Sequence, residues 1–428
     1  MAFLKTSKNC LRASHLRLAA SLAAVVAAAE LSHPAAAKTY AELLQFNGTN
    51  GAGPQSGVLF DGGVLYGVTA GGGSAGDGVV YSLSPLANGQ WSFNVIYNFL
   101  GGTLDGATPI GGLVADASGI LYGTTSAAGG AGQGTVFQLI PPSTPAGTWT
   151  EKTLYNFQGG ANDGSAPLAN LIIDTEGNLY GATSAGGAAG EGVVFELSPP
   201  KSAGGEWTET VLYAFKGGAS DGSTPTAGPT FGPQGALYGT TIGGGALGLG
   251  VAFELAPPSG STTTWTETIL FDFLGFQGGG GPEGGVALGR DGALYGAAET
   301  QGSKGWGVVY KLAPPTSGQT LWTESDLHEF TGESDGGFPV GPIVIGTNGA
   351  LYGVTAAGGG PLGAGTIYEL KPPAAGKTKW TFSTLYKFQV ASDGATPLGG
   401  VIFGAKGALF GTTSAGGSNG AGLVFELQ

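Results

Sequence analysis

The pentapeptide Leu-Tyr-Gly-Thr-Thr, or a close variant of it, occurs seven times along this chain. The copies begin at Leu65, Leu121, Leu179, Leu237, Leu294, Leu351 and Leu409, at intervals of 56 to 58 residues. A fixed period of this length indicates a repeat architecture, in which each unit packs mainly against its neighbours. The repeat therefore constrains the fold more strongly than any shorter motif does.

One unit is clearest over residues 167–215, where turn residues separate four short strand-like runs. These runs lie at 171–174, 179–183, 193–197 and 207–215. Four short antiparallel strands in each unit are the pattern of one propeller blade. We therefore predict an all-β fold, a seven-bladed β-propeller of four-stranded antiparallel blades.

The chain ends suggest how the ring closes. The fourth strand of a unit carries a tryptophan and, eight residues later, a phenylalanine, as in Trp207 and Phe215. A seventh such phenylalanine, Phe46, ends the segment 39–46, whereas the last unit, 398–427, shows only three strand-like runs. We infer that strand 39–46 completes the last blade, because closure of this kind protects sheet edges.

The first 37 residues have the pattern of a secretory signal peptide. Four basic residues precede a short apolar stretch at 18–29, and three small residues end at Ala37. The apolar stretch is short for a membrane span, and no later segment has 18 consecutive apolar residues. We expect a signal peptide at 1–37, a propeller domain at 38–428, a secreted (extracellular or periplasmic) location and no membrane insertion after cleavage.

Composition narrows the chemistry further. The formal net charge is −13, which argues against nucleic acid and anionic membranes as partners. The single cysteine, Cys10, lies in the expected signal peptide, so the remaining chain has no disulfide and no thiol nucleophile. The 86 glycines recur in register with aromatic residues, which favours a folded repeat over low complexity. We expect a monomer.

Residues 111–149 show the repeated string in full: Gly-Gly-Leu, Asp, Gly, Leu-Tyr-Gly-Thr-Thr, Gly-Gly, Val-Phe, Pro-Pro and Trp. This string resembles the GloVer-type tandem-repeat family, and the resemblance covers essentially the whole chain after residue 37. The resemblance implies a secreted bacterial protein, often one that ends in a sorting anchor, although this chain shows no such tail. It implies no particular activity, cofactor or catalytic residue.

Strand alternation places loops of two kinds on one face of the predicted propeller. The loops between second and third strands share this face with the blade-joining segments, and we call it the upper face. The turns between first and second strands lie on the opposite, lower face. The upper loops hardly vary in length, and functional sites usually occur on elaborated loops, so this regularity favours a binding or scaffold protein over an enzyme.

An Asp-Gly pair recurs in the blade-joining segments. A ring of calcium sites is one interpretation, because Ca²⁺ binds several oxygen ligands. The other is an Asx-type turn, in which the carboxylate accepts hydrogen bonds from nearby backbone. We favour the turn, because each site offers one carboxylate. The aspartates are Asp105, Asp163, Asp221, Asp335 and Asp393.

The repeat breaks between the fourth and fifth blades, where a Gly-rich segment with Phe276, Gln277 and Glu283 replaces the Asp-Gly pair. Nearby upper loops carry Leu249 and Trp306 at one variable slot between glycines. An exposed Trp306 would offer a stacking surface for a sugar or a peptide. Alternatively, its ring folds down and fills space. The candidate ligand-binding residues are Leu249, Phe276, Glu283, Glu299 and Trp306.

Catalytic patterns are sparse. His328 with Asp326 and Glu329 suggests a general base, and Asp326 and His328 are expected on one face of a strand. That strand is outermost in its blade, so a polar cluster at the edge is the simpler interpretation. Ser-His-Asp order, a His-rich metal set and phosphate-binding fingerprints are absent from the sequence. We therefore predict no catalytic residues and no cofactor other than calcium.

Three functions remain open. The first is a secreted non-catalytic binding or scaffold module for extracellular carbohydrate or protein. The second is a polysaccharide-acting hydrolase or lyase that uses upper-face carboxylates such as Glu283 and Glu299. The third is structural packing in an extracellular matrix or a protein complex. A carboxylate pair buried at the hub would favour catalysis, and a pair on an open rim would favour binding.

Overall fold

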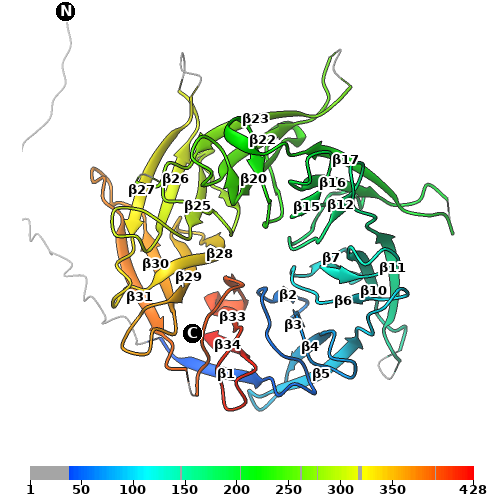
Figure 1. Ribbon diagram of the computed structural model, residues 1–428. Coiled ribbons are helices and arrows are strands. Elements are labelled where there is room, and N and C mark those ends of the chain that lie inside the picture. Colours follow the sequence, from blue (N-terminus) through cyan, green and yellow to red (C-terminus); the bar gives the residue numbers. More distant parts are fainter. Residues whose placement is uncertain are drawn as a thin grey trace, which may run out of the picture. The chain divides into compact units, whose positions relative to one another are not determined.

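The computed structural model describes residues 38–428 except 145–146, 203, 261–262, 277, 317–320 and 391. The expected signal peptide and Gln277 therefore lie outside the described residues. Residues Lys38–Gln428 form one compact unit. In this unit seven four-stranded antiparallel sheets follow one another around a central hub, which confirms the predicted seven-bladed β-propeller (Figure 1). No helix among the described residues has the length and hydropathy needed to cross a membrane.

The strands run from the hub outward, in chain order in the first six blades and with the N-terminal strand outermost in the last. The first four blades are β2 (Leu59–Asp61), β3 (Val64–Thr69), β4 (Val79–Pro85) and β5 (Trp91–Asn98); β7 (Val114–Ala115), β8 (Leu121–Thr125), β10 (Thr135–Ile140) and β11 (Thr150–Asn156); β13 (Ile172–Ile173), β14 (Leu179–Thr183), β16 (Val193–Ser198) and β17 (Thr208–Ala214); and β19 (Thr230–Phe231), β20 (Leu237–Thr241), β22 (Val251–Ala256) and β23 (Thr266–Asp272).

The remaining blades follow the same order. They are β24 (Val286–Leu288), β25 (Leu294–Ala298), β26 (Val308–Ala313) and β27 (Thr323–Glu329); β28 (Gly337–Ile345), β29 (Leu351–Ala357), β30 (Thr366–Lys371) and β31 (Thr381–Lys387); and β32 (Val401–Phe403), β33 (Leu409–Thr413), β34 (Leu423–Leu427) and β1 (Tyr40–Gln45). Three 3₁₀ turns, η1 (Gly218–Ser220), η2 (Pro233–Gly235) and η3 (Ala405–Gly407), lie in loops.

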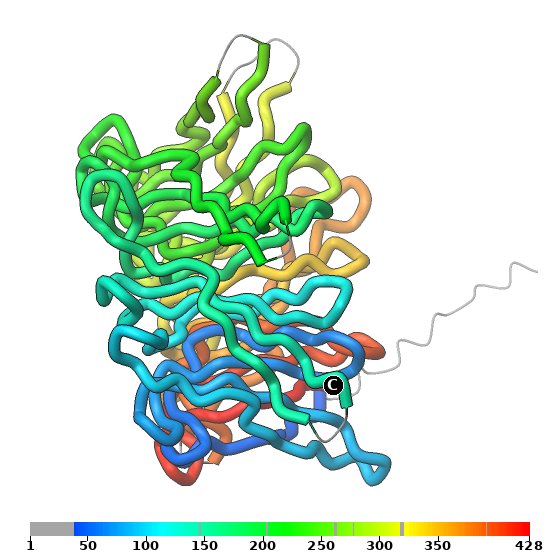
Figure 2. The backbone as a smooth tube through the Cα atoms, turned by 90° about the vertical axis from the view of Figure 1, so that its right-hand side faces the viewer, coloured from blue at the N-terminus to red at the C-terminus, as the bar shows by residue number. Residues whose placement is uncertain are grey.

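The first strand of the chain is the outer strand of the last blade. β1 pairs antiparallel with β34, from Tyr40 opposite Leu427 to Gln45 opposite Leu423. In Figures 1 and 2 the blue N-terminal strand lies beside the red C-terminal blade. Phe46 is fully buried, and its ring meets that of Tyr81 edge to face at 5.2 Å. This arrangement confirms the inferred closure.

The glycine of Leu-Tyr-Gly has a packing role. In each second strand it lies opposite an aromatic residue of the third strand, as Gly123 lies opposite Phe137 in the second blade. A Cβ atom at position 123 would lie 2.6 Å from that ring, so only glycine leaves room for it. The same pairing occurs in every blade, with Phe or fully buried Tyr as the aromatic residue.

The threonines of the motif hold backbone in place. The last threonine is fully buried, and its hydroxyl donates to a carbonyl two residues later, as from Thr183 to Ala185 at 2.8 Å. The preceding threonine, where present, reaches the next blade: Thr412 Oγ1 donates to the Ser56 carbonyl at 2.7 Å. These bonds satisfy buried polar groups and join neighbouring blades.

The motif tyrosine forms a second link between blades on the lower face. The Tyr122 ring meets Trp207 of the next blade edge to face at 6.1 Å. Its hydroxyl donates to Asp116 Oδ2, in the turn between first and second strands, at 3.1 Å. Tyr180 with Asp174 and Tyr295 with Asp291 repeat this hydrogen bond, at 3.1 and 2.9 Å.

The upper face is assembled as the sequence predicts. Two-stranded ribbons pair a blade-joining segment with the loop that follows the second strand of the next blade. The ribbons are β6 (Gly106–Ala107) with β9 (Ala127–Ala128), β12 (Gly164–Ser165) with β15 (Ala185–Gly186), and β18 (Gly222–Ser223) with β21 (Gly243–Gly244). This pairing holds the entry to the hub in a fixed geometry.

Candidate functional site

Four of the five blade-joining aspartates, Asp105, Asp163, Asp221 and Asp393, are buried and surrounded by donors. Asp163 Oδ1 accepts a hydrogen bond from Gly164 N at 2.6 Å, and Oδ2 accepts from Gln158 N at 2.6 Å and from the Tyr155 hydroxyl at 3.0 Å. Asp105 and Asp221 repeat these three contacts, and Asp393 repeats the tyrosine contact and one backbone contact. The carboxylate therefore accepts from nearby backbone, as the turn interpretation expects, but from the residues one later and five earlier and not from the residue two later that defines an Asx turn. Calcium binding here stays a prediction.

The tyrosine partner was missed at the sequence level, although a signal existed. Tyr97, Tyr155 and Tyr213 each precede their aspartate by eight residues. Where the aspartate is lost, between the fourth and fifth blades, the tyrosine is Phe271 instead. The two residue types therefore change together within this one chain, as expected for hydrogen-bonded partners.

His328 takes the place of the tyrosine in the fifth blade. Its Nε2 lies 3.2 Å from Asp335 Oδ2, and its ring stacks on Phe382 at 3.9 Å. Burial lowers the pKa of His328, although Asp335 opposes that shift. Asp335 also accepts from Thr331 N at 3.1 Å. These contacts make His328 part of a blade junction.

The expected grouping of His328 with Asp326 is wrong. The pairing of β26 with β27 shifts register between Val309 and Tyr310, which marks a bulge in the outer strand. Asp326 Oδ1 accepts from Gly278 N, on the fourth-blade side, at 3.1 Å, whereas His328 faces the sixth blade. Glu329 accepts from the Ser303 hydroxyl. The three side chains therefore serve different contacts.

The variable slot in the upper loops lies over a glycine of the next junction. Leu249 is half-buried beside Gly275, and Trp306 is half-buried over Gly332. The Trp306 ring also packs on Phe338, with ring centroids 4.9 Å apart. Trp306 therefore folds down, as in the second of the two interpretations. Phe276 is the aromatic residue exposed near this junction, at 83%.

A cavity of about 330 Å³ opens at the hub, and we call it the hub cavity. Every blade contributes to its lining, and each contributes the residue after the proline that follows the junction. These seven residues are Gln55, Ile110, Leu168, Thr226, Glu283, Val340 and Leu398. Four are aliphatic and three are polar, so the cavity has walls of mixed character.

Four glycines, from the first, fifth, sixth and last blades, line part of the hub cavity. Gly284 and Gly341 come from neighbouring blades, and a Cβ atom at Gly284 would lie 1.9 Å from the Gly341 carbonyl oxygen. Gly57 and Gly399 approach each other in the same way. Because backbone meets backbone at these positions, the segments that carry the lining side chains have little freedom to move.

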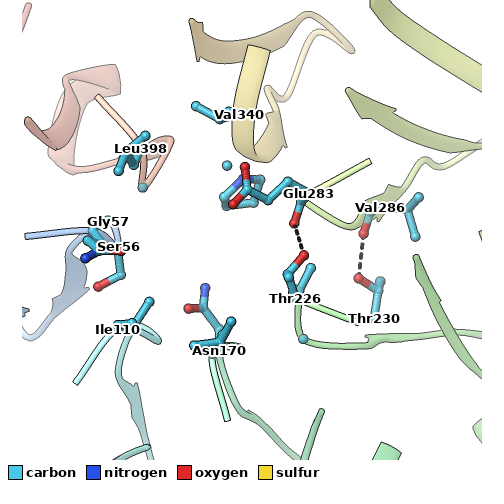
Figure 3. A pocket seen from close by; sticks show the side chains of 18 of the residues that line it. Ser56, Gly57, Ile110, Asn170, Thr226, Thr230, Glu283, Val286, Val340 and Leu398 are labelled. Carbon is cyan, nitrogen blue, oxygen red and sulfur yellow. Dashed lines mark hydrogen bonds between the residues drawn. The ribbon is translucent and has the colours of Figure 1, made fainter. Parts of the chain in front are cut away.

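The polar wall is formed by Asn170, Thr226 and Glu283 (Figure 3). Asn170 Oδ1 accepts from Gly112 N at 2.5 Å, which leaves its amide NH₂ free to face the cavity. Thr226 Oγ1 donates to the Glu283 carbonyl at 3.3 Å. Nothing in the sequence analysis singled out Asn170, Gln55 or Thr226. Gln55 and Thr226 share the position after the repeated proline, which was the available signal for them, whereas Asn170 lies three residues after Pro167.

Of the five candidate ligand-binding residues, the structure places one in the hub cavity. Glu283 is exposed toward it and is the single carboxylate among the described residues that line it. Burial of the carboxyl by surrounding protein, and then the charge of Glu299, raise the pKa of Glu283. Glu299 is half-buried outside this lining, and burial raises its pKa as well. Leu249 and Phe276 lie at the junction between the fourth and fifth blades, whereas Trp306 packs over Gly332 at the junction between the fifth and sixth.

Comparisons with known proteins agree with this fold. A family model described as Gloeobacter/Verrucomicrobia repeat matches residues 32–144, 92–268 and 234–428. A candidate 6-phosphogluconolactonase from Bacteroides uniformis has 14% sequence identity and a TM-score of 0.51, over 83% of this chain and 89% of that one. An ulvan lyase, bound to its saccharide, has 11% identity and a TM-score of 0.48, over 91% and 95%. A search of curated proteins found no match.

Proposed function

This chain belongs to the Gloeobacter/Verrucomicrobia repeat family, and from that premise we propose that it is a non-catalytic binding module that holds a carbohydrate unit in the hub cavity. The hub cavity carries the proposal. Its volume of about 330 Å³ lies in the range of small-ligand sites, and it combines apolar walls with a few converging polar groups. Asn170, Thr226 and Glu283 offer the donors and acceptors that sugar hydroxyls need.

The construction of the hub cavity supports this proposal. Backbone segments of all seven blades line the cavity, and glycines of neighbouring blades are in close contact at Gly284 and Gly341 and at Gly57 and Gly399. The side chain after the proline differs from blade to blade. A rigid scaffold with variable side chains lowers the cost of ordering the site when a ligand binds. We also propose that the protein acts outside the cytoplasm, on the pattern of residues 1–37. Sequencing of the mature N-terminus tests this and should begin at Lys38.

Binding to a glycan array, followed by titration calorimetry on each hit, tests the hub proposal. We expect Glu283→Gln and Asn170→Ala to weaken binding by about tenfold or more, since each removes a polar contact worth roughly 1.4 kcal/mol. Glu176→Gln, on an exposed lower-face turn, is the matched control and should bind normally. Hub variants that bind as well as the wild type would contradict the proposal.

Two aromatic residues of the upper face outside the hub cavity, Phe276 and Trp306, are tested separately in the same experiment. Trp306→Ala and Phe276→Ala alter the upper face outside the hub cavity. If these variants lose binding while the hub variants keep it, the ligand lies on the upper face outside the hub cavity, near the two junctions that flank the fifth blade. If the array shows no binding at all, protein partners or a structural role remain.

Catalysis by Glu283 and Glu299 is the second candidate, favoured by the electrostatic interaction that raises the pKa of Glu283. A carboxylate pair needs both groups at one scissile bond, and Glu299 is outside the hub lining. Incubation with polysaccharides, and assays for new reducing ends and unsaturated products, test this. Activity that is lost in both Glu283→Gln and Glu299→Gln would support an enzyme.

A further inference from the structure

A second cavity, of about 550 Å³, lies on the lower face where the last blade meets the first, and we call it the seam pocket. Its wall contains Phe60, Trp91 and Phe410. The Phe60 and Phe410 rings stack at 5.9 Å with a 20° interplanar angle, and Trp91 meets Phe410 edge to face at 5.7 Å. Phe60 and Trp91 are half-buried, so they keep apolar surface open to the pocket.

The last blade differs from other blades at this corner. The second, third and fifth blades have a motif tyrosine whose hydroxyl donates to an aspartate of the lower turn. In the last blade the tyrosine is Phe410, so the donor is missing. Gly404 stands in the position of Asp116 and Asp174, and Lys406 stands in that of Asp291. The corner that carries an aspartate in the second, third and fifth blades, and Gln234 or Asn348 in the fourth and sixth, carries a lysine here.

The charges around the seam pocket are unusual for this protein. Lys38 and Lys406 line it, both are exposed, and neither forms an ion pair with a described residue. The chain as a whole has a net charge of −13, so two free lysines beside an aromatic wall are a local reversal of sign. Glu426 also lines the pocket and accepts a hydrogen bond from Gln428 Nε2 at 2.8 Å.

We propose that the seam pocket binds an acidic sugar unit, with its ring against Trp91 and Phe60 and its carboxylate between Lys38 and Lys406. Aromatic faces pack well against sugar rings, and the lysines provide charge-assisted hydrogen bonds to a carboxylate. The Glu426 carboxylate accepts hydrogen bonds from sugar hydroxyls, and the Gln428 amide donates hydrogen bonds to them. A ligand with an acid group alone would meet repulsion from Glu426, whereas a hydroxylated ring would be held by it.

This site is distinct from the hub cavity and does not depend on the function proposed for it. Titration of the protein with a galacturonic acid trisaccharide, followed by calorimetry and tryptophan fluorescence, tests it. The same trisaccharide with its carboxyls reduced is the neutral comparison. We expect the acidic form to bind at least about tenfold more tightly, and its affinity to fall with salt, because exposed charges are screened.

Two double variants locate the binding. Lys38→Gln with Lys406→Gln should weaken binding of the acidic trisaccharide at least about tenfold. Lys377→Gln with Lys379→Gln makes the same change in net charge on exposed lysines of the sixth blade and should leave binding intact. A loss of binding in the first double variant with normal binding in the second places the ligand at the seam pocket and separates this site from the hub. Absence of binding by the folded wild type, or equal losses in both double variants, would overturn the proposal.

Discussion

Gly296 of β25 lies directly opposite Tyr310 of β26, and a Cβ atom at position 296 would lie 2.2 Å from the tyrosine hydroxyl oxygen. The tyrosine is fully buried, so its ring cannot move into solvent to relieve that contact. This pair shows in one place why the Leu-Tyr-Gly motif and the aromatic residue of the next strand recur together around the ring.

We predict that Gly296→Ala lowers the free energy of unfolding by roughly 1–3 kcal/mol, the usual cost of overpacking a dense core. Chemical denaturation with constant slope would measure it. Gly360→Ala is the control, because no heavy atom lies within 4 Å of a Cβ atom at that exposed position. If both variants unfold at the same denaturant concentration, the packing explanation of the motif is wrong.

The Tyr310 hydroxyl leads to a second prediction. It is buried and has no hydrogen-bond partner among the described residues, and the same holds for Tyr81. The second, third, fourth and seventh blades have phenylalanine at this position. Tyr310→Phe should therefore leave stability unchanged or raise it by about 1 kcal/mol, because a buried unpaired hydroxyl is costly.

The comparison variant for this measurement is Tyr155→Phe, which removes a hydroxyl that donates to Asp163 at 3.0 Å. It should destabilise the protein by about 1 kcal/mol. Thermal and denaturant unfolding of the two variants should thus move in opposite directions. A clear loss of stability in Tyr310→Phe would mean that its hydroxyl is hydrogen-bonded at the hub.

Ring closure gives a third prediction. Phe46 and Phe157 occupy equivalent positions, and both are fully buried. If β1 contributes to the last blade as β11 does to the second, Phe46→Ala should cost about 3–5 kcal/mol, as Phe157→Ala should. Leu104→Ala, at a side chain that is 93% exposed, should be neutral. A mild effect of Phe46→Ala alone would indicate that β1 docks weakly.

Four half-buried glutamates make stability depend on pH. Burial and Asp105 raise the pKa of Glu151 to about 7, burial and Asp163 do the same for Glu209, and Glu267 follows this pattern. Burial and Asp326 raise the pKa of Glu324 to about 8. The junction aspartate is missing here, and the carboxyl of Asp326 is the charge next to Glu324 instead. Asp326 also accepts a hydrogen bond from Gly278 N.

The sign of the pH dependence follows because the folded state binds the protons of these four glutamates more tightly than the unfolded state does. Their stabilising contribution is complete below pH about 4.5 and is lost as the pH rises through about 7 to 8. We therefore predict a lower melting temperature at pH 8 than at pH 5. Each glutamate should contribute roughly 1 kcal/mol, less than the full shift implies, because solvent partly screens these side chains.

Glu209→Phe with Glu267→Phe should flatten this dependence, since the first and sixth blades already have Phe93 and Phe382 at the same repeat position. Glu176→Gln, on an exposed turn, should keep it. His328 works in the opposite direction, because its lowered pKa favours the folded state at high pH. A melting temperature that rises from pH 5 to pH 8 would show that the histidine outweighs the glutamates.

How far the sequence leads can be judged from particular residues. The period of Leu-Tyr-Gly was enough to predict seven blades, and the stray Phe46 was enough to predict which strand closes the ring. Both inferences succeed because every blade must bury the same faces of its strands, so the same pattern of residues recurs seven times in one chain. The backbone contacts of the Asp-Gly carboxylates were predictable, because they join residues close together in sequence, although the donors are not those of an Asx turn.

Contacts between blades were decided by the tertiary structure. A bulge in the outer strand β27 directs the side chains of Asp326 and His328 toward opposite neighbouring blades, although simple alternation would place them on one face of the strand. Trp306 folds over Gly332, and Glu283 reaches the hub while Glu299 stays outside its lining. The sequence by itself determined the repeated unit and its closure. The packing of one blade against the next determined which side chains meet, because the contacts named above join residues 26 to 54 positions apart, for which no short motif exists.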